Sequence, residues 1–455
     1  METGRTFSTN PPAQRPESDV SGWVGLTGLA GLAVWLLFCR SYPAIADALA
    51  LPGPHEVLSG PNAALMGIVF AALPMILWSV LVDKVHRRPS TGIDWTRPRK
   101  WGADAEVSLT KLGGLWATWA IIAVLYVMCR WYWDGQFLFS MKVIGYAAIP
   151  MVVLSVPYVF WLDRVLVNPR DSAWHFGAMV FNTGEYDPEQ VKKHWRAWII
   201  KAFFIAFMIS IVPGGFQNTV EADFSAVANN PVQLGWVLIN LLFLIDVQIG
   251  TVGYLVTFRP LDAQIRSGNP FLAGWLAALM CYPPFVWVII GNGDVLSYEH
   301  NVADWGIWLQ LQPGLAWIWA ALLVFLTGVS AWATFIFGLR FSNLTYRGVL
   351  TNGPYRFTRH PAYLSKNLFW WCSVMPFFVT NGSLSDALRN CFFLLCVNGI
   401  YYWRAKTEEA HLMMEDEKYR QYHAWMAAHG PITRRLEALK RKLNEKNNTV
   451  AQPAE

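Results

Sequence analysis

The sequence predicts an all-α protein, a polytopic transmembrane bundle of about ten helical spans with both termini in the cytosol. The first observation behind this prediction is composition: 54% of the 455 residues are hydrophobic and only 15% are charged, whereas soluble domains carry roughly 25% charged residues. The second is that the apolar residues form blocks of about 17–25 residues, the length with which a helix crosses the bilayer. The third is an alternation along the chain between basic loops and loops without Lys or Arg.

Ten apolar blocks follow one another along the chain as candidate spans. They are Trp23–Cys39, Ala63–Val82, Leu112–Cys129, Val143–Leu162, Trp198–Val212, Val232–Phe258, Phe271–Ile290, Leu315–Phe337, Leu368–Val379 and Ala387–Trp403. The ninth block is short and contains Pro376, so we expect a kinked or re-entrant segment there. The first block also fits a signal peptide, but the long segment before it and the spans after it favour a membrane helix.

Basic residues are concentrated in every second loop between these blocks. The basic loops contain Lys84, Arg87, Arg88, Arg97, Arg99, Lys100 and Lys111; then Arg164, Arg170, Lys192, Lys193 and Arg196; then Arg259 and Arg266; and then Arg340, Arg347, Arg356, Arg359 and Lys366. Three of the loops between them, Ser41–Gly60, Pro213–Pro231 and Gly291–Gly314, contain no Lys or Arg. Because basic loops stay in the cytosol, this pattern places the basic loops and both termini there.

The chain divides into four regions on this interpretation. Residues 1–21 are polar and rich in Pro, Ser and Thr, which is typical of a disordered tail, and residues 22–314 form a bundle of about seven spans without an assigned function. Residues 315–432 form a C-terminal transmembrane domain. Residues 433–455 are a basic, helix-prone tail that either lies on the anionic leaflet or is a solvated helix.

Several kinds of site are not indicated by the sequence. The six cysteines lie in apolar blocks or at their edges, and no two form a C-x-x-C pair, so we interpret them as packing residues without disulfides or a metal site. The formal net charge of +5 is small and gives no indication of nucleic-acid binding. We expect membrane lipids as neighbours, and the oligomeric state stays open.

The loop after the eighth block differs in composition from the other loops. It reads GLRFSNLTYRGVLTNGPYRFTRHPAYLSKN over Gly338–Asn367, and its Asn-Gly-Pro-Tyr stretch predicts a turn. His360-Pro361 predicts the start of the next helix, because proline is favoured in a first turn. A helix start attracts anions through its free N–H groups, and Arg356 and Arg359 add positive charge. The loop is therefore a candidate binding site.

A second candidate segment follows the tenth block. It reads YYWRAKTEEAHL, and Arg404 and Glu408 share a helix face because they are four residues apart. An apolar stripe then continues through Leu412, Tyr419, Tyr422 and Met426. Carboxylates at this position suit a ribose diol or a cation, whereas the alternative is ordinary interfacial anchoring by aromatic, Arg and Glu side chains.

Together, the two segments resemble the isoprenylcysteine carboxyl methyltransferase and phospholipid methyltransferase family. The matching pattern is G-P-Y-R-F-x-R-H-P-x-Y, then R-x-x-x-E-E-x-x-L, then K-Y-x-x-Y, carried by Gly353, Pro354, Tyr355, Arg356, Arg359, His360, Pro361, Tyr363, Arg404, Glu408, Glu409, Leu412, Tyr419 and Tyr422. The resemblance covers residues 315–432 and implies a methyltransferase-like domain. It implies S-adenosylmethionine (SAM) at the cytosolic face and a lipid-like or prenylated acceptor that enters from the bilayer.

The resemblance also implies roles for individual residues. Cofactor binding falls to Tyr355, Arg356, Arg359, His360, Pro361, Tyr363, Glu408 and Glu409, and catalysis to Arg404 and Glu408. Methyl transfer from a sulfonium depends mainly on positioning and on exclusion of water, and a carboxylate acceptor needs no base. An amine or phenol acceptor loses a proton, for which Glu408, Glu409 and His411 are the candidates.

Some residues depart from the family pattern or lie outside it. Lys366 occupies a position where a small residue is expected, and Asp416-Glu417 replaces a glycine before the last motif. Asp246 lies inside the sixth block, where an ionisable residue indicates either a functional site or a satisfied contact between helices. The first seven spans exceed the family's minimal bundle, so the acceptor stays open.

Two other functions remain compatible with the sequence. Sterol-reductase-like enzymes that use NADPH also have about ten spans and an R-H-P-x-Y helix start, but the Gly-Pro-Tyr turn and the Glu408-Glu409 pair favour the methyltransferase. The absence of a G-x-G-x-x-G loop does not count against such a reductase. The third function is a non-catalytic lipid-binding membrane protein, which predicts no cofactor binding.

Overall fold

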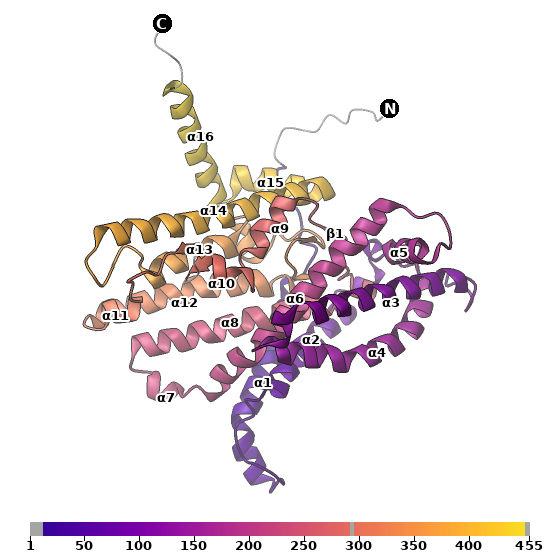
Figure 1. Cartoon of the computed structure of the whole chain (residues 1–455), viewed down its shortest axis with the longest axis horizontal. Coiled ribbons are helices and arrows are strands. Elements are labelled where there is room, and N and C mark those ends of the chain that lie inside the picture. The colour runs from indigo at the N-terminus through magenta and orange to yellow at the C-terminus, as the bar shows by residue number, and fades with distance from the viewer. Residues whose placement is uncertain (1–11, 292–294, 451–455) are drawn as a thin grey trace.

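The computed structural model describes residues 12–291 and 295–450 of the chain, almost entirely as helices (Figure 1). The longer helices are α1 Gly22–Ala48, α2 Pro61–Leu81, α3 Ala105–Met128, α4 Phe137–Asp163, α5 Ser172–Phe181, α6 Pro188–Glu221, α8 Pro231–Leu255, α12 Pro313–Phe335, α13 Pro361–Val374, α14 Leu384–Glu415, α15 Glu417–His429 and α16 Thr433–Val450. The shorter ones are α7 Phe224–Val227, α9 Leu272–Leu279, α10 Phe285–Ile289 and α11 Trp305–Leu309, and 3-10 turns cover Val85–Arg87, Pro89–Thr91, Arg130–Trp133, Arg259–Leu261, Gly338–Arg340 and Gly353–Arg356.

Two pairs of short strands complete the described secondary structure. Strand β1 (Ser267–Gly268) pairs antiparallel with β4 (Thr345–Tyr346). Strand β2 (Ile290–Gly291) pairs in parallel with β3 (Leu296–Ser297). The first pair ties the loop before α9 to the loop before α13, and these loops are far apart in the sequence.

The predicted fold class is confirmed, because seven helices are long and apolar enough to cross a membrane. They are α1, α2, α3, α4, α6, α8 and α12, and they coincide with most of each of the first six predicted blocks and the eighth. The chain is therefore a multi-pass, all-α integral membrane protein.

The other three predicted blocks are not long apolar helices. The seventh was expected as one span, but it is divided into α9 and α10 around Pro283-Pro284, because proline removes a backbone donor and crowds the preceding turn. The ninth corresponds to α13, which has 14 residues and ends before Met375, whose φ is 51°. The tenth lies in α14, which is 32 residues long but carries Arg389 and Asn390 near its start.

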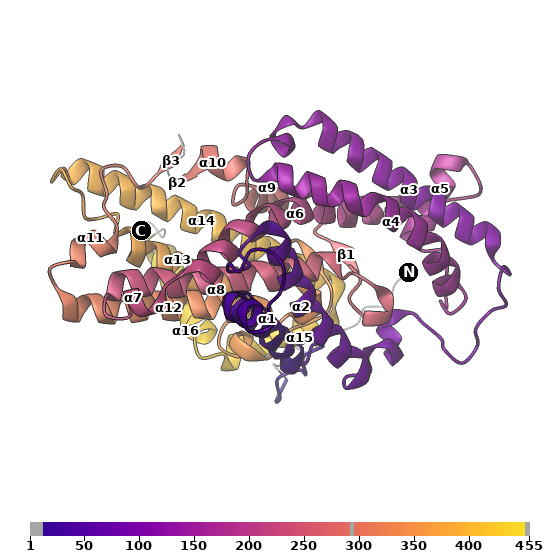
Figure 2. The ribbon, with the colours of Figure 1, turned by 90° about the horizontal axis from the view of Figure 1, so that it is seen from below.

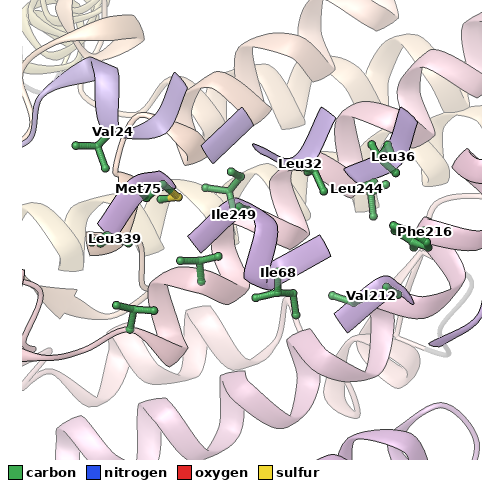
Figure 3. Packing of buried hydrophobic residues seen from close by; sticks show 14 of the residues in the cluster. Val24, Leu32, Leu36, Ile68, Met75, Val212, Phe216, Leu244, Ile249 and Leu339 are labelled. Atoms are coloured by element: carbon green, nitrogen blue, oxygen red, sulfur yellow. The ribbon is translucent and has the colours of Figure 1, made fainter. Parts of the chain in front are cut away.

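The helices pack in two groups around a shared core. Figures 1 and 2 show α8, α12, α13 and α14 side by side, with α3, α4 and α5 on the other side of α6. Between them, α1 and α2 contribute Leu32 and Met75 to a buried cluster with Phe216 of α6 and Ile249 of α8 (Figure 3). A Cβ atom on Gly31 of α1 would lie 2.0 Å from a backbone oxygen of α2, so glycine allows these two helices to pack closely.

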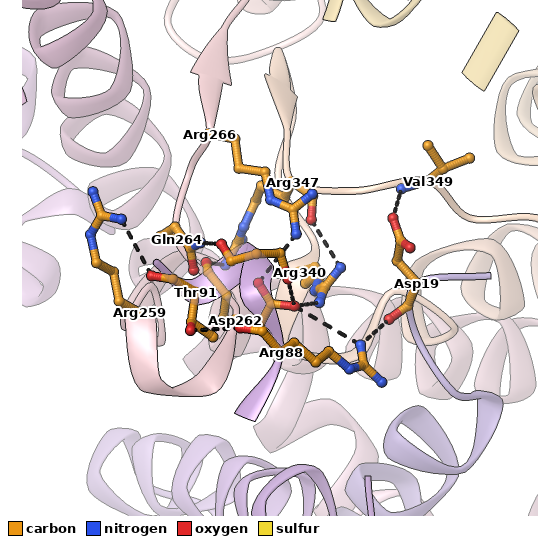
Figure 4. Close-up of polar contacts among 12 residues, drawn as sticks. Asp19, Arg88, Thr91, Arg259, Asp262, Gln264, Arg266, Arg340, Arg347 and Val349 are labelled. Atoms are coloured by element: carbon orange, nitrogen blue, oxygen red, sulfur yellow. Dashed lines mark hydrogen bonds and ion pairs between the residues drawn. The ribbon is translucent and has the colours of Figure 1, made fainter. Parts of the chain in front are cut away.

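The loops are grouped as the alternation of charge predicts. Basic loops contact each other and the N-terminal segment: Arg88 donates to the Asp19 carbonyl at 2.7 Å, and Arg340 donates to Asp262 at 2.5 Å (Figure 4). The loops without Lys or Arg also pair with one another. There Ser59 donates to Glu221 at 2.6 Å, and Asn301 donates to Asp386 in the first turn of α14 at 2.9 Å. The assignment of the basic side to the cytosol stays a prediction.

The predicted disordered tail is partly ordered in the structure. The Asp19 carboxylate accepts a hydrogen bond from the Val349 N–H at 2.7 Å, and Thr351 donates to the Pro16 carbonyl at 2.7 Å. Residues 12–21 therefore pack against the loop before α13, whereas residues 1–11 lie outside the described residues. The basic tail begins as a helix, as expected, and residues 451–455 also lie outside the described residues.

A buried polar network fixes the loop that carries the candidate site. Asp262 is 1% exposed and accepts hydrogen bonds from Arg340, from Ser90 at 2.7 Å and from Arg266 at 3.2 Å (Figure 4). Arg347 donates to several backbone carbonyls, among them that of Gly253 near the end of α8 at 2.8 Å. Since helix-end carbonyls lack partners within the helix, Arg347 connects α8 to this loop.

Candidate functional site

A cavity of about 390 Å³ lies where α6, α8, α12, α13 and α14 meet the loop before α13. The polar residues of its wall include Asn343, Tyr355, Arg359, His360, Arg404 and Glu408. The apolar residues between the membrane helices include Phe207, Met208, Phe243, Leu326, Phe369 and Trp370. The cavity therefore has a polar part near the loop and an apolar part between the spans.

The loop forms the predicted turn and helix start. A 3-10 turn covers Gly353–Arg356, and α13 begins at Pro361 with His360 as its N-cap residue. Gly353 has φ 55°, and a Cβ atom there would lie 2.9 Å from Ile336, so the turn requires glycine. The His360 and Tyr363 rings stack with their centroids 5.5 Å apart. Both predictions are confirmed, and they place His360 and Tyr363 at the cavity.

Arg404 is held at the cavity wall by groups from three other parts of the chain. It is 2% exposed and donates to Asn343 Oδ1 at 2.6 Å and to the Tyr282 hydroxyl at 3.3 Å. Its Nε atom lies 3.4 Å from Glu408, and its guanidinium carbon lies 5.0 Å from the centre of the Tyr363 ring. A guanidinium with this many contacts has a fixed orientation.

Glu408 presents a carboxylate to the cavity. Its Oε1 atom accepts a hydrogen bond from the Tyr363 hydroxyl at 2.5 Å and pairs with Arg404. Its Oε2 atom has no hydrogen-bond partner among the side chains and backbone atoms that the structure describes. The Glu408 side chain is 20% exposed, so Oε2 is available to a donor or a cation on a ligand.

Glu409, the neighbouring carboxylate, lies in a cluster of four cationic or titratable side chains. Arg359 Nε is 3.2 Å from it, His360 Nε2 3.1 Å, Lys406 Nζ 2.6 Å and His423 Nε2 3.7 Å. Burial raises its pKa, but hydrogen bonds from the two histidines and the Arg359 charge hold the pKa well below its usual range. Glu409 therefore ties the loop, α14 and α15 together.

The cavity contains most of the site residues that were predicted from the sequence. Its wall includes Tyr355, Arg359, His360, Tyr363, Arg404 and Glu408. Arg356, Pro361 and Glu409 do not line it. Arg356 is exposed and donates to the Gly353 carbonyl at 3.1 Å, whereas Pro361 occupies the first turn of α13. The assigned roles of all these residues stay predictions.

Other wall residues were not identified from the sequence. Asn343 and Tyr282 both contact Arg404, but Asn343 lies in a loop with many polar residues and Tyr282 in a block that was interpreted as a span. Phe207 and Met208 come from α6 and Phe243 from α8. Nothing in their local sequence marks them, because they reach the cavity only through packing between helices.

Helix α15 and the C-terminal end of α14 close the cavity on the loop side. The Tyr422 hydroxyl donates to the Tyr355 carbonyl at 2.7 Å, and Tyr419 also lines the cavity. His411 Nε2 lies 2.9 Å from the Ser267 hydroxyl. Burial lowers the pKa of His411 to about 4, with a smaller effect of Arg196, so His411 is neutral at pH 7.

Comparison with known proteins identifies one region of the chain. Residues 301–426 match the model of a family described as a protein of unknown function (DUF1295). The matched region contains α11 to α14, most of α15 and every site residue predicted from the sequence. It contains none of α6 or α8, which complete the cavity. No curated protein and no solved structure matches the chain.

Among the residues with described positions, no group of three or more His, Cys, Asp or Glu side chains is arranged to hold a metal ion. The DUF1295-like region, together with α6 and α8, forms a site of arginine, carboxylate, tyrosine and histidine side chains.

Proposed function

We propose that this membrane protein is a SAM-dependent methyltransferase that acts on a lipid-like or prenylated acceptor at the cytosolic face of the membrane. The observation that carries the proposal is one cavity whose polar part contains Arg404, Glu408 and His360 and whose apolar part lies between membrane helices. Such a cavity suits a polar donor and a lipid-soluble acceptor at the same time. The family resemblance of the two sequence motifs supports the same function.

The chemistry of the wall residues fits SAM. Glu408 Oε2 is available for the ribose diol or the ammonium group, and the start of α13 offers N–H groups to the carboxylate. The rings of Tyr282, Tyr363 and Tyr401 line the cavity and suit a sulfonium, because aromatic faces attract cations. When bound, SAM supplies a methyl group on a positively charged sulfur. The chain then contributes orientation, through Arg404 and Glu408, and exclusion of water by α15.

The charges in the cavity favour SAM over NADPH. The phosphates of NADPH need uncommitted cations, but Arg340 is paired with Asp262, Arg359 with Glu409, and Arg404 with Asn343 and Glu408. Lys366 is the exception among the cations of the wall, because only Asp246, at 3.6 Å, is paired with it. Arg347 donates to backbone carbonyls. The Glu408 carboxylate, whose Oε2 atom is available, also lines the cavity. Because most of these cations are engaged within the protein while a Glu408 oxygen is free, the site suits SAM better than NADPH.

Calorimetric titration of the purified full-length protein with SAM, its demethylated product and NADPH tests the proposal. We expect the first two to bind. Glu408→Gln should weaken SAM binding about 10-fold or more, since a hydrogen bond to a charged group contributes roughly 1.5–3 kcal/mol. Glu417→Gln, a change at an exposed position of α15, is the matched control. Binding of NADPH alone would replace the proposal with a sterol-reductase-like function, and binding of none would favour a non-catalytic lipid-binding protein.

A further inference from the structure

Two charged residues that the proposed function leaves unused meet in the cavity. Asp246 of α8 and Lys366 of α13 both line it, and Lys366 Nζ lies 3.6 Å from Asp246 Oδ2. One turn away on each helix, the rings of Phe243 and Phe369 contact each other with centroids 6.1 Å apart. The ion pair therefore borders the apolar part of the cavity.

This pair has unused hydrogen-bonding capacity. Its 3.6 Å separation is just beyond hydrogen-bond distance, and neither side chain makes a hydrogen bond or a second ion pair in the part of the chain that the structure describes. The other Arg, His and Glu side chains of the wall are each hydrogen-bonded within the protein; they are Arg340, Arg347, Arg359, His360, Arg404, Glu408 and His411.

The pair lies where unused hydrogen-bonding capacity is energetically unfavourable. The Asp246 and Lys366 side chains are 15% and 33% exposed, and they lie on helices of a membrane bundle. Charged groups at membrane depth are unfavourable unless their remaining donors and acceptors are satisfied. A polar group of a ligand in the cavity would supply the missing partners.

Charge balance indicates which head group suits this pair. An anionic head group would compete with Asp246 for Lys366 and leave a carboxylate uncompensated, which is unfavourable in a poorly solvated site. A cationic head group would do the same to Lys366. A neutral hydroxyl or amine donates a hydrogen bond to Asp246 and accepts one from Lys366, so it satisfies both.

We propose that Asp246 and Lys366 bind the head group of the methyl acceptor, that the acceptor carries a neutral O–H or N–H nucleophile, and that Asp246 takes its proton. This inference rests on the proposed methyltransferase function. As the new O–CH₃ or N–CH₃ bond forms, the methyl–sulfur bond breaks and its electron pair stays on the sulfur, which becomes a neutral thioether. The O–H or N–H proton moves to the Asp246 carboxylate, so atoms and charge balance.

The other proton acceptors considered for this step are less suited to it. Glu408 already accepts a hydrogen bond from Tyr363 and pairs with Arg404. Glu409 does not line the cavity. His411 lines it, but its Nε2 atom is engaged with Ser267 at 2.9 Å. Asp246 is the carboxylate of the wall with the most free acceptor capacity.

Three acceptors with the same ring and tail test the inference: 4-dodecylphenol, 4-dodecylaniline and 4-dodecylbenzoate. Each is offered, with methyl-labelled SAM, to the full-length protein in lipid nanodiscs at pH 7. We expect label in the phenol or the aniline at a rate at least 10-fold above the benzoate. Asp246→Asn should lower that rate about 100-fold or more, since loss of a general base costs roughly 10²–10⁴-fold, while SAM affinity changes by less than 2-fold.

Asp246→Glu should recover part of the rate, and Asn240→Ala, a change at an exposed position of the same helix, is the matched control. The inference is overturned if the benzoate is methylated as fast as the phenol and the aniline, or if Asp246→Asn keeps the wild-type rate. It is also overturned if SAM binds but neither neutral acceptor is labelled. The acceptor comparison needs only the wild-type protein, so it holds even if Asp246→Asn does not fold. Absence of SAM binding would instead overturn the proposed function.

Discussion

Arg404 connects residues that are distant in the sequence. Asn343 precedes α13, Tyr282 lies between α9 and α10, and Glu408 is one turn further along α14. The guanidinium contacts all three with one planar group. An ammonium group at this position keeps the positive charge but cannot reproduce the fork of donors.

Replacement of Arg404 by Lys therefore tests orientation separately from charge. We expect Arg404→Lys to lower the rate of methyl transfer about 10-fold or more, because a misplacement of about 1 Å can lower a rate by up to roughly 100-fold. Thermal unfolding should change little, since the charge and the Glu408 partner remain. Arg389→Lys, at the opposite end of the same helix, is the control. An unchanged rate for Arg404→Lys would show that only the charge matters there.

Glu409 acts on the scale of helices, because its carboxylate joins α14 to the loop before α13 and to α15. Its pKa is lowered in the folded protein from an ordinary value of 4.5. A group with a lowered folded pKa stabilises the fold above its unfolded pKa, and this stabilisation is lost as the pH falls further. Protonation at low pH and removal of the charge by mutation should therefore have similar effects.

The expected result is a pH-dependent difference between wild type and Glu409→Gln. At pH 7 the variant should unfold at a lower temperature, and hydrogen exchange in α15 should be faster. The difference should shrink as the pH falls below about 4.5, where the unfolded carboxyl is protonated. Glu417→Gln serves as the control on an exposed carboxylate. A difference that is equal at pH 7 and pH 4 would show that the Glu409 charge does not stabilise α15.

At this scale the sequence predicted some elements better than others. The helix start at His360-Pro361 is encoded locally, by proline and turn residues, and the structure agrees. Phe271–Ile290 has the apolar content of a span, but Pro283 and Pro284 outweigh that content and break the helix. The contact between Asp246 and Lys366 joins two helices. A local sequence pattern does not specify which helices pack against each other, so this contact could not be predicted from the sequence.

The whole molecule consists of a C-terminal region that matches a family model, residues 301–426, and of the helices that precede it. The DUF1295-like region supplies the motif residues, and α6 and α8 supply much of the apolar wall. The first seven predicted spans thus contribute directly to the cavity. Since the wall uses both parts, we expect neither part alone to form the complete site.

The orientation of the molecule in the membrane is testable on the same scale. The basic loops are expected in the cytosol because Lys and Arg are retained there, and the structure brings them into contact with one another. Cysteine can be introduced on each side: Thr96→Cys lies in a basic loop and Ala226→Cys in a loop without Lys or Arg, and both positions are exposed. The wild-type cysteines are buried or half-buried, so the unmodified protein is the control for background labelling.

A membrane-impermeant maleimide should label Ala226→Cys in intact cells and Thr96→Cys only after the membrane is opened. This result would place the loop end of the cavity, with His360 and Glu408, on the cytosolic side, where SAM is available. The reverse pattern would move that end to the other face of the membrane. Because a cytosolic cofactor could not reach the polar part of the cavity from there, the reverse pattern would also contradict the proposed methyltransferase function.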